Sequence, residues 1–242
     1  MRATSQKCGR LASHTSKPLK PKAQAPLHAG AFFVGQKFDG EPNIKVIDIE
    51  VAPLLGHAWG RYETNIIEEE RGWYMLSIAW KTLGSRKTHV LALPDFKGYK
   101  EHPEDDRKLL EAVRGLLDEA DVLIGQNICR YDLRKINARL LVHGMEPPRP
   151  YMTIDTLKIA RRYFMFDSNK LDDLGKQLGV GRKLKTHGKD TWLGCMRGDM
   201  NEWRNMKRYN KQDVELNEKV FEKMLPWILS KENRRKPIAV KV

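Results

Sequence analysis

The stretch from residue 44 to residue 51, Ile-Lys-Val-Ile-Asp-Ile-Glu-Val, constrains the fold more than any other part of the chain. Its β-branched residues indicate a buried strand, which two carboxylates, Asp48 and Glu50, interrupt. Side chains alternate along a strand, so both carboxylates point to one face while Ile47 and Ile49 point to the other. Carboxylates held together in a partly desolvated site repel each other unless a cation lies between them. The strand therefore either contributes to a metal site or turns an acidic face to water.

The charge and cysteine content of the chain limit its class. Of its 242 residues, 44 are Lys or Arg and 31 are Asp or Glu, which gives a formal net charge of +13. This charge favours a polyanionic partner, nucleic acid above all, because each neutralised phosphate releases counterions. Ribosome-associated proteins, proteins on anionic membranes and merely soluble proteins share this composition, so charge sets only the sign of the partner. The three cysteines form no Cys-x-x-Cys pair, so neither a disulfide framework nor a zinc finger is expected.

Composition divides the chain into three parts. Residues 1–40 contain no acidic residue before Asp39 and are predicted to be a disordered basic arm. A transit peptide is the alternative, but lysines outnumber arginines there and three prolines would break an amphipathic helix. Residues 41–230 are predicted to form one folded domain, and residues 231–242 a basic C-terminal tail. Without an apolar run near the roughly 18 residues of a membrane span, or a signal-peptide core, we expect a cytoplasmic protein that binds no membrane.

Hydrophobic periodicity predicts a mixed α/β sheet in the central domain. After the first strand, residues 73–83 and 88–93 are predicted to form a hairpin beside it. The elements expected after the hairpin are a helix at 106–120, a strand at 121–125, helices at 131–143, 156–166 and 171–178, and a last helix at 201–225 that Pro226 ends or kinks. Residues 52–70 and 180–189 are predicted to be loops, the second of them basic.

Two more carboxylates lie where an apolar helix face is expected. The inward stripe of the last helix contains Asp213, and Tyr209 lies one turn earlier on the same face. Asp132 shares a face with Ile136 and Leu140 on an earlier helix. Each has an ordinary explanation, either partial exposure or, for Asp132, a favourable interaction with the helix dipole. Burying an unpaired carboxylate is costly, so Asp213 should meet a cation or several donors.

Asp48, Glu50, Asp132 and Asp213 together place four carboxylates on three elements that can meet at the mouth of one sheet. Hard oxygen ligands of this number suit Mg²⁺ or Mn²⁺. Two such ions, about 3.5 to 4 Å apart, clamp the attacking and leaving oxygens of an in-line phosphoryl displacement. The arrangement is typical of a nuclease.

Three segments then carry a family resemblance. Asp48-Ile49-Glu50, Asn127 to Asp132 and Tyr209 to Asp213 resemble, in order and separation, the three exonuclease motifs of the DEDD superfamily, which has a ribonuclease H-like fold. A tyrosine four residues before the last aspartate resembles the tyrosine subclass, and Arg208 stands where the histidine subclass has its histidine. The resemblance covers about residues 44–224. In its early loop and hairpin the chain looks most like phage-type exonucleases related to the proofreading domains of family B polymerases.

This resemblance implies an α/β fold with a ribonuclease H-like mixed β-sheet flanked by helices. It implies a metal-dependent 3′-to-5′ exonuclease that hydrolyses DNA, with RNA as the alternative, and releases nucleoside monophosphates by a two-metal-ion mechanism. The implied partners are a single-stranded 3′ end and a separately encoded polymerase or other replication proteins. If the gene belongs to a phage, the implied location is the host cytoplasm.

The resemblance also implies roles for individual residues. Asp48 would bridge two Mg²⁺ or Mn²⁺ ions, Glu50 and Asp213 would hold the ion that carries the attacking water, and Asp132 would support the second ion. Tyr209 would orient that water, because a phenol with a pKa near 10 is a poor base at neutral pH.

Five residues are predicted to contact nucleic acid: Asn127, Tyr131, Trp59, Lys185 and Lys189. Asn127 and Tyr131 would shape the nucleotide pocket or hold Asp132, and Trp59 could stack a base because it lies in a loop. The two lysines could bind phosphates, although solvated charge is the commoner role of such runs. Asp155 is interpreted as a helix N-cap.

Two other functions remain open at this stage. One is a structure-selective endonuclease on the same fold, and the other is a non-catalytic nucleic-acid-binding subunit. Four intact carboxylates argue against the second, since a binding module gains nothing from holding them beside a polyanion without metal.

Overall fold

The computed structural model describes residues 40–63, 65–229 and 240–241. The elements in these ranges are β1 (Ile44–Val51), β2 (Leu55–His57), β3 (Glu68–Arg71), β4 (Met75–Thr82), β5 (His89–Ala92), a 3-10 turn (Leu93–Asp95), α1 (Arg107–Glu119), β6 (Val122–Gly125), α2 (Asp132–Val142), β7 (Met152–Asp155), α3 (Thr156–Tyr163), α4 (Leu171–Gln177), α5 (Lys189–Met196), α6 (Met200–Ile228) and β8 (Val240–Lys241). Apart from residues 40 and 240–241, the predicted arm and tail lie outside the described residues.

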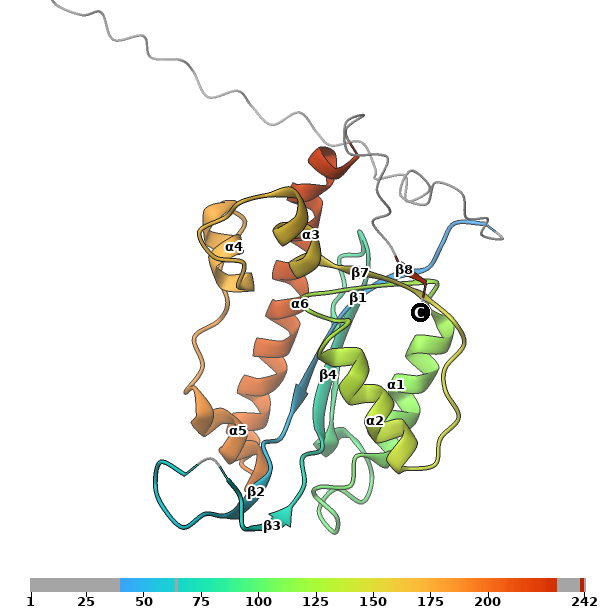
Figure 1. The fold of residues 1–242 in the computed structure, drawn as a ribbon. Helices are drawn as coiled ribbons and strands as arrows, with labels where there is room; N and C mark the ends of the chain where they lie inside the picture. The colour runs from blue at the N-terminus through green and yellow to red at the C-terminus, as the bar shows by residue number, and fades with distance from the viewer. Residues whose placement is uncertain (1–39, 64, 230–239, 242) are drawn as a thin grey trace, which may run out of the picture.

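A six-stranded mixed sheet, in the order β5-β4-β1-β6-β7-β8, forms the centre of the fold. β1 pairs antiparallel with β4 and parallel with β6, and β6 pairs parallel with β7. The outer pairs, β4 with β5 and β7 with β8, are antiparallel. Helices α1 and α2 cover one face of the sheet, and α3 to α6 lie on the other (Figure 1). The mixed α/β sheet and the hairpin beside the first strand, both predicted from the sequence, are confirmed.

Alternation along β1 divides its side chains between two hydrophobic cores. Ile47 and Ile49 pack in the core that α1 and α2 cover, whereas Val46 packs in the core between the sheet and α6. Asp48 and Glu50 follow Val46 at intervals of two, so they face α6 as well. The pleat of one strand thus directs two carboxylates toward the long C-terminal helix.

Helix α6 extends over 29 residues and contacts β1, β4 and β5 as well as α3, α4 and α5. It begins at the N-cap Asp199, whose side chain accepts a hydrogen bond from the backbone of Asn201. It does not end at Pro226, one of the two outcomes expected, but continues to Ile228. Proline removes one donor near the end of the helix, while the backbone N–H of Leu229 still closes the last turn on Leu225.

Residues 52–70 were expected to be a loop, and this prediction is wrong because they contain two paired strands; the basic loop is a loop up to Gly188, as predicted. β2 and β3 pair as a small antiparallel sheet, although the sequence of β3, Glu-Glu-Glu-Arg, has no hydrophobic alternation to reveal it. At Gly56 the strands approach so closely that an added Cβ would lie 2.5 Å from the carbonyl oxygen of Glu68. Helix α5 follows the basic loop, and its buried residues are Thr191, Gly194 and Cys195, which form no apolar stripe.

Candidate active site

Asp48 and Glu50 from β1 meet Asp213 from α6. One carboxylate oxygen of each residue lies within 4.8 Å of the others. Asp213 is only 1% exposed, because it projects from the face of α6 that packs on the sheet. The prediction that the hydrophobic stripe of this helix carries a buried aspartate is therefore confirmed.

Asp132 adds a fourth carboxylate from the first turn of α2. Its side chain is buried, and its Oδ1 accepts a hydrogen bond from the backbone N–H of Ile49 at 3.2 Å. This bond fixes Asp132 against β1, between the positions of Asp48 and Glu50. Three elements that are distant in sequence thus bring four carboxylates to one place on the sheet.

The pKa values of these carboxyl groups are displaced because the charges are buried together. Burial raises the pKa of Asp48 well above its usual range, and the charges of Glu50, Asp132 and Asp213 raise it further. Burial and Asp213 raise the pKa of Glu50 to about 8, and burial raises that of Asp132 to about 7. Burial also raises the pKa of Asp213, against the opposing effect of Lys183. The cluster therefore favours protons or cations.

Lys183 supplies the ammonium group that pairs with this cluster. Its Nζ donates to Oδ2 of Asp213 at 2.6 Å and to the hydroxyl of Tyr209 at 2.8 Å. Burial lowers the pKa of Lys183, but Asp213 and Tyr209 raise it by more, so Lys183 stays charged. Sequence reasoning assigned this residue only to a basic loop, where nothing distinguished it from the neighbouring cations.

Asn210 and Trp192 orient two of the carboxylates, and the sequence interpretation missed both roles. The side-chain amide of Asn210 donates to Oδ2 of Asp48 at 2.6 Å, while its oxygen accepts from Ser77 at 3.0 Å. The indole N–H of Trp192 donates to Oε2 of Glu50 at 3.2 Å. A signal existed for Asn210, since it follows Met206 by four residues on the buried face. None pointed to Trp192.

Tyr209 lies beside Asp213 with its ring edge against Trp192, the ring centroids being 5.7 Å apart. Burial raises the pKa of Tyr209, and the charge of Asp213 raises it further. The phenol therefore stays protonated at neutral pH. Because the hydroxyl oxygen accepts the hydrogen bond from Lys183, the hydroxyl O–H is left to donate a hydrogen bond to another oxygen.

The donor set fits hard divalent cations. All four acidic groups offer carboxylate oxygens, and one ammonium does not balance them. Oδ1 of Asp213 is buried and has no hydrogen-bond partner among the described residues, which is costly unless a cation approaches it. Mg²⁺ and Mn²⁺ match such oxygen ligands.

The other predicted nucleic-acid contacts fall into two groups. Tyr131 adjoins the carboxylates, whose charges add to the effect of burial in raising its pKa. Asn127 has a left-handed backbone (φ 62°), and its N–H donates to Asp155 at 3.0 Å. Asp155 also accepts from the first turn of α3, so its predicted N-cap role is confirmed.

Trp59, Lys185 and Lys189 are exposed, and within the described ranges none of them forms a hydrogen bond or ion pair with the carboxylates. Trp59, 85% exposed, lies between β2 and β3, and the two lysines lie in and just after the basic loop that carries Lys183. Their contact with nucleic acid stays a prediction.

A mixed sheet on which one strand and two helices gather four carboxylates around one point defines an α/β protein whose acidic cluster could hold divalent metal. The chain belongs to the RNase_H superfamily, whose family model matches residues 63–225. The ribonuclease H-like mixed sheet flanked by helices is thereby confirmed. This superfamily implies a nuclease with a nucleic-acid substrate and divalent metal ions.

Among solved structures, the chain resembles the family B DNA polymerase from the hyperthermophilic archaeon Pyrobaculum calidifontis, with a TM-score of 0.57 and 18% sequence identity. The match covers 80% of this chain and 26% of the polymerase chain, so this chain corresponds to about a quarter of that protein. At this identity the likeness concerns the fold. No curated protein matches the sequence. In the described ranges, every helix is too short or too polar to cross a bilayer.

Proposed function

We propose that the protein is a metal-dependent 3′-to-5′ exonuclease of the tyrosine subclass of the DEDD superfamily. It would hydrolyse DNA, with RNA as the alternative, from a single-stranded 3′ end and release nucleoside monophosphates. The observation that carries this proposal is the position of Tyr209, protonated, bonded to Lys183 and one turn from Asp213 in the cluster with Asp48 and Glu50.

Asp48, Glu50, Asp132 and Asp213 would hold two Mg²⁺ or Mn²⁺ ions. When bound, such ions stabilise charge on the phosphoryl group and lower the pKa of a coordinated water. Asp48 would contact both ions, because it is flanked by the other three acidic groups.

The surrounding side chains prepare this centre. Asn210 and Trp192 hold Asp48 and Glu50 in fixed orientations through hydrogen bonds. Tyr209 would donate a hydrogen bond from its hydroxyl to an oxygen of the attacking water or of the scissile phosphate. This bond would orient the group that accepts it. Lys183 places a positive charge beside Asp213, where it can attract the phosphate oxygens.

The net charge of +13 supports a polyanionic substrate. Contacts of Asn127, Tyr131, Trp59, Lys185 and Lys189 with that substrate are part of the proposal. So are the basic arm at 1–40, the tail at 231–242, and a partnership with a separately encoded polymerase or other replication proteins, phage-encoded or otherwise.

The test follows 5′-labelled single-stranded DNA and RNA of equal sequence, with Mg²⁺, Mn²⁺ or EDTA, for the wild type and for Asp48→Asn. A ladder that descends by single nucleotides, and is lost with EDTA or in the variant, is expected. Discrete internal fragments would indicate an endonuclease instead. Tight binding without cleavage of the DNA or the RNA would indicate a non-catalytic binding subunit.

A further inference from the structure

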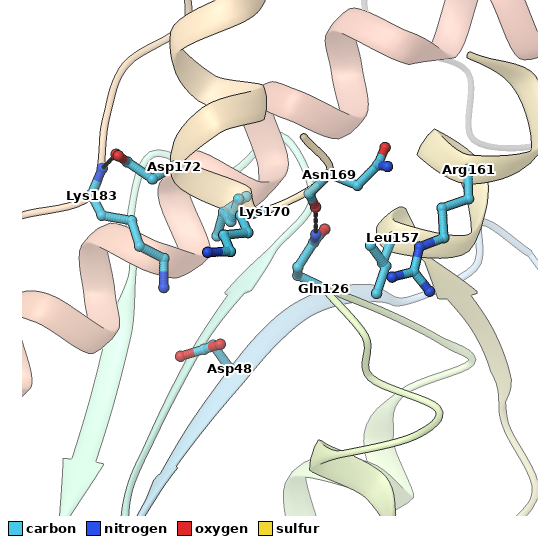
Figure 2. A pocket seen from close by; sticks show the side chains of 9 residues that line it. Asp48, Gln126, Leu157, Arg161, Asn169, Lys170, Asp172 and Lys183 are labelled. Carbon is cyan, nitrogen blue, oxygen red and sulfur yellow. Dashed lines mark hydrogen bonds between the residues drawn. The ribbon is translucent and has the colours of Figure 1, made fainter. Parts of the chain in front are cut away.

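A cavity of about 450 Å³ opens beside Asp48, between the end of β6, helix α3 and the start of α4 (Figure 2). Asp48 lies at one side of it, with Lys183 and Lys170 above, and Arg161 lies at the far side. Its volume is within the range of about 300 to 1,000 Å³ found for small-ligand sites. The cavity is therefore a second binding space next to the carboxylates.

Arg161 and Lys170 give this cavity an uncompensated positive charge. Neither side chain forms an ion pair or hydrogen bond with a residue in the described part of the chain. The one acidic wall residue apart from Asp48 is Asp172, which already binds Arg182 at 2.6 Å and the backbone N–H of Lys183 at 2.8 Å. The two free cations can thus bind an external anion.

The remaining walls combine apolar and hydrogen-bonding groups. Leu157 and Leu171 offer apolar surface, and the amide of Gln126 donates to the backbone oxygen of Asn169 at 2.8 Å, which closes the cavity on that side. Asn169 thus contributes a backbone oxygen that is already bonded, and the polar groups that the described wall residues leave free at the cavity are the two cations. Anion-binding cations and this apolar surface together suit a nucleotide with its phosphate.

The two ends of the site differ in charge. The cavity with Arg161 and Lys170 adjoins α3 and α4, whereas β2 and β3 lie at the opposite end of the site (Figure 1). There β3 exposes the run Glu68 to Glu70, which would repel a continuing strand. A 3′-terminal nucleotide has no phosphate beyond the scissile one, but the strand on its other side carries one at every nucleotide. Free cations therefore belong on the side of the polymer.

We propose that this cavity binds the nucleotide on the 5′ side of the scissile bond, and that Arg161 and Lys170 bind the backbone phosphates of that strand. The inference rests on the proposed exonuclease function and adds the direction in which the strand leaves the carboxylates. The end with Arg161 and Lys170 holds the polymer, and the end toward β2 and β3, where Trp59 lies, receives the terminal nucleoside.

The test compares Arg161→Gln/Lys170→Gln with Arg162→Gln/Lys176→Gln. The control removes the same residue types, and hence the same charge, from exposed positions of α3 and α4 that do not line the cavity. Binding of a fluorescent single-stranded oligonucleotide is measured by anisotropy in EDTA at several salt concentrations. Hydrolysis therefore does not enter the readout.

Loss of the two cations should weaken binding by at least about tenfold. It should also reduce the slope of log K against log[salt] by about 1.4, or 0.7 for each lost phosphate contact. The control should change both much less. With Mg²⁺ added, KM should rise in the cavity variant while kcat stays near the wild-type value.

A neutral methylphosphonate, moved one linkage at a time from the 3′ end, locates the contact. Wild type and control should lose affinity when a linkage just 5′ of the scissile one is neutral, and the cavity variant should be insensitive to that change. Equal sensitivity in the cavity variant, or equal affinity loss in the control, would overturn the proposal. Absence of hydrolysis by the wild type with this binding pattern intact would instead reject the proposed function alone.

Discussion

The carboxylate of Asp106 and those of the active-site cluster are neutralised in different ways. Asp106, fully buried where α1 begins, accepts hydrogen bonds from the backbone N–H of Met75 at 2.8 Å, from Arg139 at 2.8 and 2.6 Å, and from His143 at 2.7 Å. In the active-site cluster, four carboxylates share one paired ammonium, and Oδ1 of Asp213 has no partner among the described residues.

This difference separates the proposed metal site from a structural ion cluster. Asp105, Asp106 and His143 also bring three ligand atoms within 4.8 Å of one another, so ligand count alone would make them a metal site. The planar guanidinium of Arg139 already donates to both oxygens of the Asp106 carboxylate. Charge that the chain leaves uncompensated, rather than the number of ligands, distinguishes the proposed functional cluster.

Substituting one aspartate in each cluster should have opposite effects on activity and stability. Asp48→Asn should reduce hydrolysis by about 10³-fold or more, the scale on which single electrostatic groups act. It should keep or raise the Tm, because it removes a charge from an uncompensated cluster. Steady-state cleavage and thermal unfolding measure the two effects. Wild-type activity in this variant would remove Asp48 from the site.

Asp106→Asn should lower the stability of the protein and leave its hydrolytic activity unchanged. It leaves Arg139 and His143 without their buried counterion, so unfolding should become easier by about 3 to 5 kcal/mol. Urea denaturation measures this loss, and activity per folded molecule should stay near the wild-type value. A stable Asp106→Asn protein that has lost cleavage would mean that the second cluster is functional.

The raised pKa values of the active-site carboxyl groups should make the stability of the metal-free protein depend on pH. The folded metal-free protein holds protons on Glu50 up to about pH 8 and on Asp132 up to about pH 7, whereas their ordinary pKa values are 4.5 and 3.8. Their contribution to stability is therefore complete below about pH 4 and is lost as the pH rises toward 8. In EDTA, the Tm should fall by about 5 °C between pH 5.5 and 8.5.

Added Mg²⁺ or Mn²⁺ should restore the lost stability. The increase of Tm should be larger at pH 8.5 than at pH 5.5. The Asp48→Asn protein is the control, and both its fall with pH and its response to metal should be smaller. Equal metal stabilisation of the variant and the wild type would place the ions elsewhere.

The smallest expected effect concerns Tyr209. Tyr209→Phe removes the hydroxyl and leaves the four carboxylates in place, so kcat should fall by about tenfold or more. The increase of Tm on adding metal should match that of the wild type, because no proposed ligand is lost. A weaker metal response would make Tyr209 part of the metal site rather than a group that orients water.

The sequence indicated the acidic cluster because its residues break hydrophobic patterns. Asp48 and Glu50 interrupt a strand, and Asp132 and Asp213 interrupt apolar helix faces. Each carboxylate can therefore be recognised from the pattern of its own strand or helix alone. Periodicity also predicted α1, β6 and α2 closely, since their buried faces are regular. The same logic explains why Asn210, a polar residue on the buried face of α6, could have been noticed.

The features of the site and fold that the sequence did not predict depend on contacts between distant segments. Lys183 lies in a loop with several other cations, and only the fold selects it for Asp213. Trp192 reaches Glu50 across 142 positions of sequence from a helix without an apolar stripe. β2 and β3 are short, exposed and partly acidic, so their pairing leaves no hydrophobic signal.

The continuity of α6 has a consequence for how this protein can evolve. Tyr209, Asn210 and Asp213 occupy little more than one turn of an uninterrupted helix that packs on the sheet along its length. Inserting or deleting one residue between Asp199 and Tyr209 would rotate all three by about 100° and shift them by about 1.5 Å. Changes of length in this interval should therefore be purged by selection as strictly as loss of Asp213 itself.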